Sequence, residues 1–163
     1  MEELPTSTLS KSTLFSLIDS LNSLFDQSYS QVLTHGDFSI TNILVDEESF
    51  EITGIVDWSL AAIMPFGMDL DILFMTTGFM TLEGWNDYSC KSRLLDTFWE
   101  EFWAVSGIEG ADRRETLRAS AEAAGRIWAV LGMAFRRNAD GSPSEDILIS
   151  EINMKQLKGW LSE

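Results

Sequence analysis

Side chains suited to catalysis lie close together in the sequence from position 35 onward. The tripeptide His-Gly-Asp occupies 35–37, Asn42 follows five residues after the aspartate, and an apolar run at 52–56 ends in Asp57. Asn42 and Asp57 carry the hard oxygen ligands that Mg²⁺ prefers, and this ion typically takes only one or two protein side chains. Asp37 could accept the proton of an attacking hydroxyl group. These residue types therefore indicate metal-assisted phosphoryl transfer.

A β-hairpin would bring the two candidate metal ligands together. Two apolar runs at 42–46 and 51–57 flank a polar turn at 47–49, which is the pattern of a hairpin. When the strands are paired about a centre near residue 49 or 50, Asn42 lies opposite Asp57. Taken singly, each of these residues also fits ordinary turn chemistry, in which Asp and Asn are common.

The rest of the chain is predicted to be mainly helical, because apolar residues recur in it with a spacing of three and four. The expected helices cover 6–29, 69–80, 88–106, 112–135 and 147–161. The helix over 88–106 has an aromatic stripe that is expected to pack in the core. No interdomain linker is visible, so residues 1–163 are predicted to form a single domain.

The long helix that begins near Asp112 has three features of its own. Asp112 and Glu115 resemble a capping box at its start. Small side chains along it would let another helix approach closely, and they are Ala121, Ala124, Gly125 and Gly132. Arg136 and Arg137 would lie at its negative C-terminal end.

Composition excludes several functional classes. The formal net charge of -15 argues against a nucleic-acid partner, because phosphate backbones bind clustered Lys and Arg. The same charge favours a small-molecule substrate that is cationic or neutral. The single cysteine, Cys90, excludes an internal disulfide and fits a reducing compartment. Carboxylates interrupt the most apolar region and no secretory signal is visible, so we expect a cytoplasmic protein with no membrane partner.

The combined pattern is more specific than its parts. It comprises HGDxxxxN, a strand, a turn, a second strand ending in VDW, and then Pro65 followed by Asp69-Leu70. This pattern resembles the aminoglycoside phosphotransferase and choline kinase-like family, whose fold is related to that of protein kinases. The resemblance implies an α+β, mostly helical fold, namely a kinase-like C-terminal lobe with a small β-hairpin that carries the catalytic loop.

The resemblance also implies roles for individual residues. Asp37 matches the catalytic aspartate, and Asn42 and Asp57 match the two Mg²⁺ ligands. His35 and Asp69 match residues that support the site structurally. Mg²⁺ and ATP are the implied cofactors.

The half of such an enzyme that grips the nucleotide is not recognisable in this sequence. Residues 1–34 contain no glycine and only one lysine, Lys11, so neither a glycine-rich loop nor a strand-borne lysine is found. No ATP-binding residue is therefore assigned, and we expect a truncated enzyme without the N-terminal lobe. Its uncovered face, with Met64, Phe66 and Met68 as candidates, would bind a complementary lobe-bearing chain or a second copy.

Three functions remain open from the sequence. The first is the catalytic lobe of an ATP- and Mg²⁺-dependent phosphotransferase that acts on a hydroxyl group of a small molecule. The second is a repurposed pocket that performs acid and base chemistry without nucleotide or binds a small metabolite, since neighbouring carboxylates push each other's pKa values apart. The third is a non-catalytic interaction module that keeps the loop for folding.

Overall fold

Helices and short antiparallel strands alternate along the chain. The structure, a computed structural model, describes residues 11–138, 143–147 and 150–161. Its α-helices are α1 (Lys11–Leu24), α2 (Asp71–Thr76), α3 (Lys91–Ser106), α4 (Ala111–Ala134) and α5 (Glu151–Leu161). Three-residue 3₁₀ turns are η1 (Ile40–Asn42), η2 (Trp58–Leu60) and η3 (Met68–Leu70). The predicted α+β, mostly helical class is confirmed.

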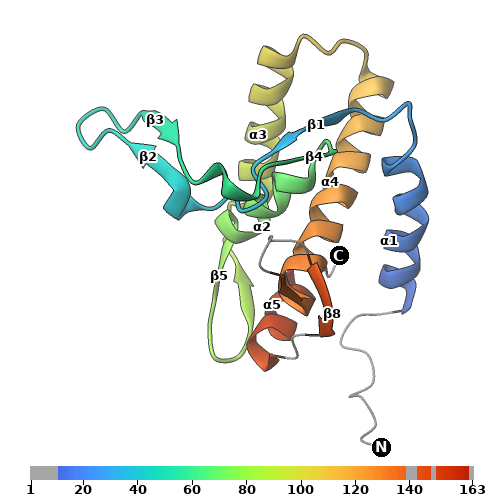
Figure 1. Cartoon of the computed structure of the whole chain (residues 1–163). Helices are drawn as coiled ribbons and strands as arrows, with labels where there is room; N and C mark the ends of the chain where they lie inside the picture. The colour runs from blue at the N-terminus through green and yellow to red at the C-terminus, as the bar shows by residue number, and fades with distance from the viewer. Residues whose placement is uncertain (1–10, 139–142, 148–149, 162–163) are drawn as a thin grey trace, which may run out of the picture.

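The strands form two-stranded antiparallel pairs. The pairs are β1 (Gln31–Thr34) with β4 (Ala62–Pro65), β2 (Ile43–Val45) with β3 (Ile52–Ile55), β5 (Gly78–Met80) with β6 (Trp85–Asp87), and β7 (Phe135–Arg137) with β8 (Pro143–Ile147). The β2–β3 hairpin projects away from the helices (Figure 1). The β1–β4 pair lies against them and frames both ends of the segment that contains His35, Asp37, Asn42 and Asp57.

Helix α4 is the central element, and α1 and α3 flank it on opposite sides (Figure 1). Its small residues Ala121, Ala124 and Gly125 are buried, whereas Gly132, the fourth residue of the expected set, is exposed. The element that approaches them most closely is the turn η3, because a Cβ added to Gly125 would lie 3.2 Å from the Leu70 carbonyl carbon. No helix in the described ranges is long and apolar enough to cross a membrane.

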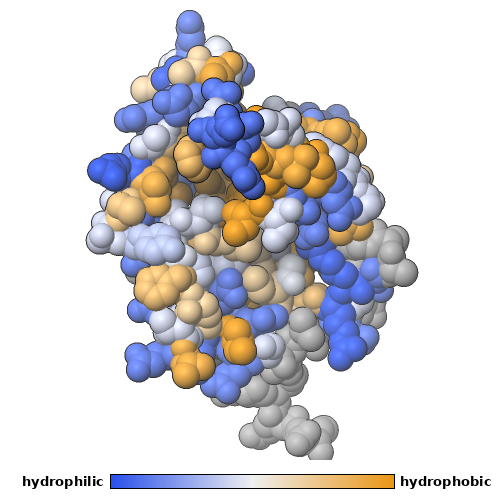
Figure 2. All heavy atoms as spheres, turned by 90° about the vertical axis from the view of Figure 1, so that its left-hand side faces the viewer, coloured by the Kyte–Doolittle hydropathy of each residue, from blue (hydrophilic) through white to orange (hydrophobic). Residues whose placement is uncertain are grey.

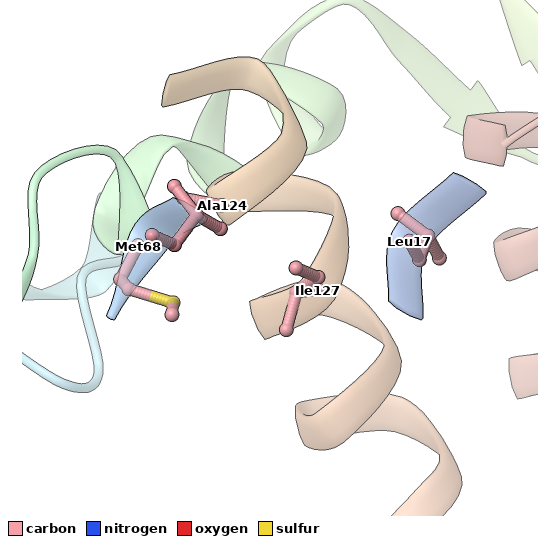
Figure 3. Packing of buried hydrophobic residues seen from close by; sticks show 5 residues of the cluster. Leu17, Met68, Ala124 and Ile127 are labelled. Atoms are coloured by element: carbon pink, nitrogen blue, oxygen red, sulfur yellow. The ribbon is translucent and has the colours of Figure 1, made fainter. Parts of the chain in front are cut away.

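One hydrophobic cluster joins α4 to α1 and η3. Its buried members are Leu17, Leu24, Met68, Ala124 and Ile127, four of which are labelled in Figure 3. Met68 is only 1% exposed, so it belongs to the core and not to an uncovered face. Burial of its Leu, Ile and Met side chains contributes roughly 1.5 to 3 kcal/mol each to folding.

A second cluster packs α5 against the other end of α4. Its buried members are Ala129, Leu157, Trp160 and Leu161. Trp160 stacks on Phe74 of α2 at 5.9 Å between ring centroids and meets Trp85 of β6 edge-on at 5.5 Å. Helix α2 is therefore held between α4 and α5, and this packing fixes the position of Asp71 at the start of α2.

The aromatic stripe of α3 packs toward α4. Trp99 is buried, and its indole N–H donates to Glu122 at 3.0 Å. The guanidinium groups of Arg114 and Arg118 lie over Trp103 and Trp99. Trp99 is the residue of this stripe that is buried in the core as expected.

The helix expected over 69–80 is wrong in its second half. Helix α2 ends at Thr76, where the hydroxyl groups of Thr76 and Thr77 donate to carbonyls of the preceding turn. Such bonds compete with continuation of the helix. The chain then turns into the β5–β6 hairpin, and Gly78 leaves room for the Asn86 carbonyl, which a Cβ would approach to 2.5 Å.

Other boundaries also differ from expectation. Helix α4 is preceded by Gly110 and has no side-chain cap, so the capping box expected at Asp112 does not form. Phe135, the expected last residue of the long helix, belongs to β7, and Ile147, the expected first residue of the last helix, belongs to β8. Part of the first expected helix, residues 1–10, lies outside the described residues.

Replacing Gly67 with alanine should destabilise the fold strongly. Gly67 has φ +103°, and an added Cβ would lie 2.5 Å from the Ala121 carbonyl oxygen and 2.6 Å from its Cα. Backbone strain and the clash with α4 together should lower the free energy of unfolding by about 2 to 4 kcal/mol in urea denaturation. Gly107→Ala is the matched control, because Gly107 also has positive φ but nothing lies near its added Cβ. Equal losses in the two variants would contradict the close contact between η3 and α4.

Candidate functional site

The 35–42 loop connects β1 to β2 and is shaped by a glycine. Gly36 has a φ of +79°, a backbone angle that residues with a Cβ rarely adopt. A Cβ added to Gly36 would also collide with the Leu60 carbonyl of η2. The loop therefore lies directly on the turn that follows Asp57. The sequence His-Gly-Asp places its glycine where this close approach requires one.

The Asp69 carboxylate holds the start of this loop. Its Oδ2 accepts the backbone N–H of His35 at 2.7 Å, and its Oδ1 accepts that of Gly36 at 3.1 Å. Asp69 comes from η3, which is packed on α4. Hydrogen bonds to an ionised carboxylate are stronger than neutral ones, so this pair ties the loop to the helical core.

His35 links the loop to the segment that carries Asp57. Its ring is buried, its Nε2 lies 2.8 Å from the Val56 carbonyl oxygen, and its Nδ1 accepts the backbone N–H of Asp37 at 3.3 Å. A carbonyl only accepts and an amide N–H only donates, so the hydrogen-bond pattern assigns the proton to Nε2. The ring also packs against Trp58 at 4.8 Å between centroids.

The hairpin register differs by one residue from expectation. Ile43 pairs with Ile55, and the Val56 N–H donates to the Asn42 carbonyl at 2.9 Å, so Asn42 lies opposite Val56 and not opposite Asp57. The cause is the position of the turn, because the Asp46 N–H donates to the Glu51 carbonyl and Val45 pairs with Ile52, which places the turn centre between residues 48 and 49. The register shift between Leu44 and Val45 then moves the pairing by one residue toward the expected register. Asp57 follows one residue after this pair.

Asn42 and Asp57, the two expected metal ligands, each carry a side-chain oxygen atom. The Asn42 Nδ2 donates to the Asp37 carbonyl at 2.9 Å, which leaves the amide oxygen for another partner. Asp57 has left-handed backbone angles (φ 61°, ψ 56°), and its Oδ1 accepts the Ser59 hydroxyl at 2.8 Å. A non-glycine residue in this conformation is uncommon and often marks a functional position.

The donor chemistry at these two residues fits Mg²⁺. An amide oxygen and a carboxylate oxygen suit this ion, which fills the rest of its shell with water and phosphate oxygens. No group of three or more His, Cys, Asp or Glu side chains in the described ranges could hold a metal ion. A metal at Asn42 and Asp57 would therefore depend on ligands from outside the protein.

A pocket of about 280 Å³ opens beside the loop. It is lined by Gly36, Asp37, Phe38, Ser39, Asp71, Met75, Trp128, Ala129, Gly132, Met133, Arg137 and Trp160. Asp37 is thus the one expected site residue that lines this pocket. Sequence reasoning missed the pocket roles of Asp71 and Arg137.

Asp71 is a partly buried carboxylate with an unusual protonation equilibrium. Burial raises its pKa to about 7, and repulsion by Asp69 adds to this effect. A hydrogen bond from the Ile72 backbone and the charge of Arg137 act in the opposite direction, and Asp37 raises the pKa slightly further. A carboxylate inside the most apolar stretch of the sequence was the available signal for this residue.

Arg137 connects β7 to the 35–42 loop. Its Nη1 donates to the Gly36 carbonyl at 3.1 Å, and its guanidinium lies 5.7 Å from the centroid of the Trp128 ring. Arg137 follows the C-terminal end of α4, as expected, and lies in β7, because α4 ends at Ala134. No local pattern could reveal a contact between residues separated by 101 positions.

Asp71→Asn should change how stability depends on pH. The raised pKa means that the folded state binds more protons than the unfolded state between about pH 4 and pH 7, so the parent should lose stability as the pH rises through that range. In urea denaturation at about pH 5 to pH 8, the variant should lack this loss and exceed the parent by roughly 1 to 3 kcal/mol at the upper end. Asp19→Asn, at an exposed position on α1, should follow the parent. Parallel curves for the parent and Asp71→Asn would contradict the buried carboxyl.

Comparison with known proteins identifies the family. The family model for the phosphotransferase enzyme family matches residues 7–93, which is more than half of the chain and includes every expected site residue. None of the curated proteins and none of the solved structures matches the chain. The match extends from α1 into the start of α3, and it includes Asp71 but not Arg137. The chain belongs to the phosphotransferase enzyme family.

Proposed function

We propose that the chain is the catalytic lobe of an ATP- and Mg²⁺-dependent phosphotransferase that acts on a hydroxyl group of a small molecule. The kinase-like C-terminal lobe is part of this proposal. Its main support is the hydrogen-bonded unit in which Asp69 and His35 hold the backbone of the Asp37 loop and Asn42 binds the Asp37 carbonyl. Such a unit suits phosphoryl transfer, because catalysis of that reaction depends mainly on positioning of the reacting groups and on neutralisation of phosphate charge.

Asp37 is proposed as the base. Its side chain is exposed at the pocket, so the hydroxyl group of a bound acceptor can reach it. The carboxylate would accept the hydroxyl hydrogen bond, direct the oxygen at the phosphorus and take the proton as the new bond forms. His35 and Asp69 are proposed to act through the backbone by keeping this carboxylate in place.

Asn42 and Asp57 are proposed to hold Mg²⁺ through their oxygen atoms. When bound, the ion would neutralise charge on the phosphate oxygens of the nucleotide. The strained backbone of Asp57 and its bond from Ser59 restrict where the carboxylate can point. The His35 bond to the Val56 carbonyl keeps this segment beside the Asp37 loop.

Asp37→Asn should abolish most phosphoryl transfer while leaving the fold intact. The asparagine keeps the shape of the side chain but cannot take the proton, so ADP formation with Mg²⁺, ATP and a panel of small hydroxyl compounds should fall roughly 100- to 10,000-fold.

Asp57→Asn should weaken Mg²⁺-dependent nucleotide binding in calorimetric titration. Asp19→Asn, a surface change on α1, serves as the control for both. Full turnover by Asp37→Asn would refute the assigned base.

A second candidate function is acid and base chemistry without nucleotide. The observation that favours it is Asp71, whose carboxyl group has a pKa of about 7 in the pocket that Asp37 also lines. Two carboxyl groups with different protonation states can serve as acid and base. Turnover that persists without Mg²⁺ and ATP, and that is lost in Asp71→Asn, would favour this function over phosphoryl transfer.

The nucleotide clamp is proposed to come from another lobe or chain. Lys91 pairs with Asp87 and Lys155 with Glu151, and neither lines the pocket with Asp37. Apolar side chains are exposed around the β2–β3 hairpin next to the proposed metal ligands, namely Ile40, Leu44, Val45, Phe50 and Ile52. Hydrophobic surface is visible in several places on this side of the molecule (Figure 2). Exposed apolar surface of this kind marks interfaces.

The hairpin surface should mediate association. Light scattering of the purified chain should find a mass that rises with concentration, and Phe50→Glu combined with Ile52→Glu should keep the chain monomeric, because burial of the added charges is costly. Phe15→Glu on α1 is the control, since Phe15 is also exposed but lies on a different element. A parent that stays monomeric would contradict self-association and leave a different chain as the partner.

A further inference from the structure

We infer that Arg137 is a positioning residue for phosphoryl transfer, because its guanidinium group holds the peptide unit that precedes the proposed base, Asp37. This inference deepens the proposed function and rests on it. Arg137 lies outside residues 7–93, so the family match assigns it no role. It comes from β7, 101 positions after the glycine whose carbonyl it binds.

The peptide unit between Gly36 and Asp37 is held on both edges. Its carbonyl oxygen, on Gly36, accepts the Arg137 Nη1–H at 3.1 Å. Its N–H, on Asp37, donates to the His35 Nδ1 at 3.3 Å. A peptide unit is planar, with its C=O and N–H on opposite edges, so these two contacts limit its tilt. The direction of the Asp37 side chain depends on that tilt, because the Asp37 Cα is attached to this unit.

The Gly36 carbonyl needs a donor that the rest of the loop does not supply. Gly36 is buried, and a buried carbonyl without a partner is costly. The Asp69 carboxylate binds the N–H groups of His35 and Gly36, but a carboxylate can only accept. Among the described residues, the donor found at this oxygen is Arg137. Since glycine permits many backbone angles, the peptide unit would be free to tilt without this bond.

The Arg137 side chain is itself held against the end of α4. Its guanidinium carbon lies 5.7 Å from the centroid of the Trp128 ring, which is the geometry of a cation–π contact. A Cβ added to Gly132, one turn further along α4, would lie 3.8 Å from Nη2. The guanidinium group therefore lies on the surface formed by Trp128 and Gly132, with Nη1 directed at the loop.

The carboxyl group of Asp71 does not draw Arg137 away from the loop. Asp71 lines the same pocket as Arg137, and the charge of Arg137 acts to lower the Asp71 pKa. The ion pairs within the described ranges do not join the two groups. Burial holds the Asp71 pKa at about 7, so below that pH most of this carboxyl group is neutral and attracts a guanidinium group weakly.

The first test needs no substrate, because nuclear magnetic resonance of the full chain reports on this peptide unit. The Asp37 amide nitrogen is bonded to the Gly36 carbonyl carbon, so its resonance responds to the hydrogen bond at that carbonyl. Arg137→Met removes the donors and keeps an apolar stem. In this variant the Asp37 amide resonance should move, and the amide hydrogen should exchange with solvent roughly tenfold faster, as loss of one charge-assisted hydrogen bond predicts.

Arg136→Met is the matched control for this measurement. Arg136 is the neighbouring residue on β7, it is also exposed, and it is not among the residues that line the pocket. The control changes the net charge by the same amount, so it should leave the exchange of the Asp37 amide as in the parent. Equal acceleration in the two variants would overturn the inference.

Trp128→Phe tests the support of the guanidinium group. Phenylalanine keeps an aromatic ring but binds a cation more weakly, so exchange of the Asp37 amide should accelerate by less than in Arg137→Met. In the Arg137→Met background, Trp128→Phe should have no further effect on this exchange, because the two side chains act as one unit. Additive effects would contradict that dependence.

Rescue distinguishes positioning from a general loss of stability. Arg137→Lys should recover part of the slow exchange, because the ammonium group donates but lacks the planar fork. Ethylguanidinium at millimolar concentration should recover part of it in Arg137→Ala, since Arg137 is exposed and solvent reaches the vacated position. A variant that is merely destabilised would not respond to this small cation.

A kinetic test connects the contact to the reaction. With Mg²⁺, ATP and the panel of hydroxyl compounds, Arg137→Met should lower kcat roughly 10- to 100-fold, because a displaced base loses alignment with the acceptor. The KM for ATP should stay within about twofold, since the lost interaction serves the transition state more than nucleotide binding.

The outcomes distinguish this inference from the proposed function. Unchanged exchange of the Asp37 amide in a folded Arg137→Met variant would overturn the inference, whether or not the chain forms ADP. Faster exchange in a chain that forms no ADP would support the hold on the loop and count against phosphoryl transfer. Faster exchange with an unchanged kcat would refute the role of Arg137 in the reaction. Thermal melting shows which variants are folded, and Trp128→Phe decides the question if Arg137→Met is not.

Discussion

The grip of the Asp69 carboxylate on the backbone of His35 and Gly36 is the constraint on which the site depends. The 35–42 loop contains little regular structure of its own, and a loop of this kind is rigid only where its backbone groups are bound. Asp69 can bind it because η3 lies directly on α4, where Gly67 and Gly125 remove the side chains that would separate the two backbones. The packing of η3 on α4 therefore fixes the position of the loop that carries Asp37 relative to the helical core.

His35 makes the positions of Asp37 and Asp57 dependent on each other. The imidazole ring binds the Asp37 N–H through Nδ1 and the Val56 carbonyl through Nε2. The two hydrogen bonds hold the ring in one orientation, so the Asp37 loop and the segment before Asp57 cannot move independently. The hydrogen bonds that join Asn42 to the Asp37 and Val56 backbones close the same unit from the hairpin side. This arrangement explains why a buried histidine can be essential to the site geometry without acting as a proton carrier.

What the sequence predicted, and what it did not, follows from the range of the interactions. The helices α1, α3, α4 and α5 and the β2–β3 hairpin were found because their apolar patterns are local. The β1–β4 pair was missed because it joins short segments about thirty residues apart. The hairpin register was off by one because the turn is centred between residues 48 and 49, and the apolar pattern does not fix that centre to within one residue. Asp37, Asn42 and Asp57 could be proposed as candidates from their spacing, whereas the Arg137 contact with Gly36 exists only in the folded chain.

The net charge of -15 bears on how an acceptor would be recognised. A field of this sign attracts cations and repels anions over a distance limited by the Debye length of about 8 Å at physiological salt. An acceptor without net charge would be neither concentrated nor excluded by this field. Its selection must come from short-range contacts inside the pocket, where water is partly displaced and a charge pair is stronger. Among the residues that the structure describes, Asp71 and Arg137 are the charged side chains that line the pocket besides Asp37, so such contacts would come from these three groups.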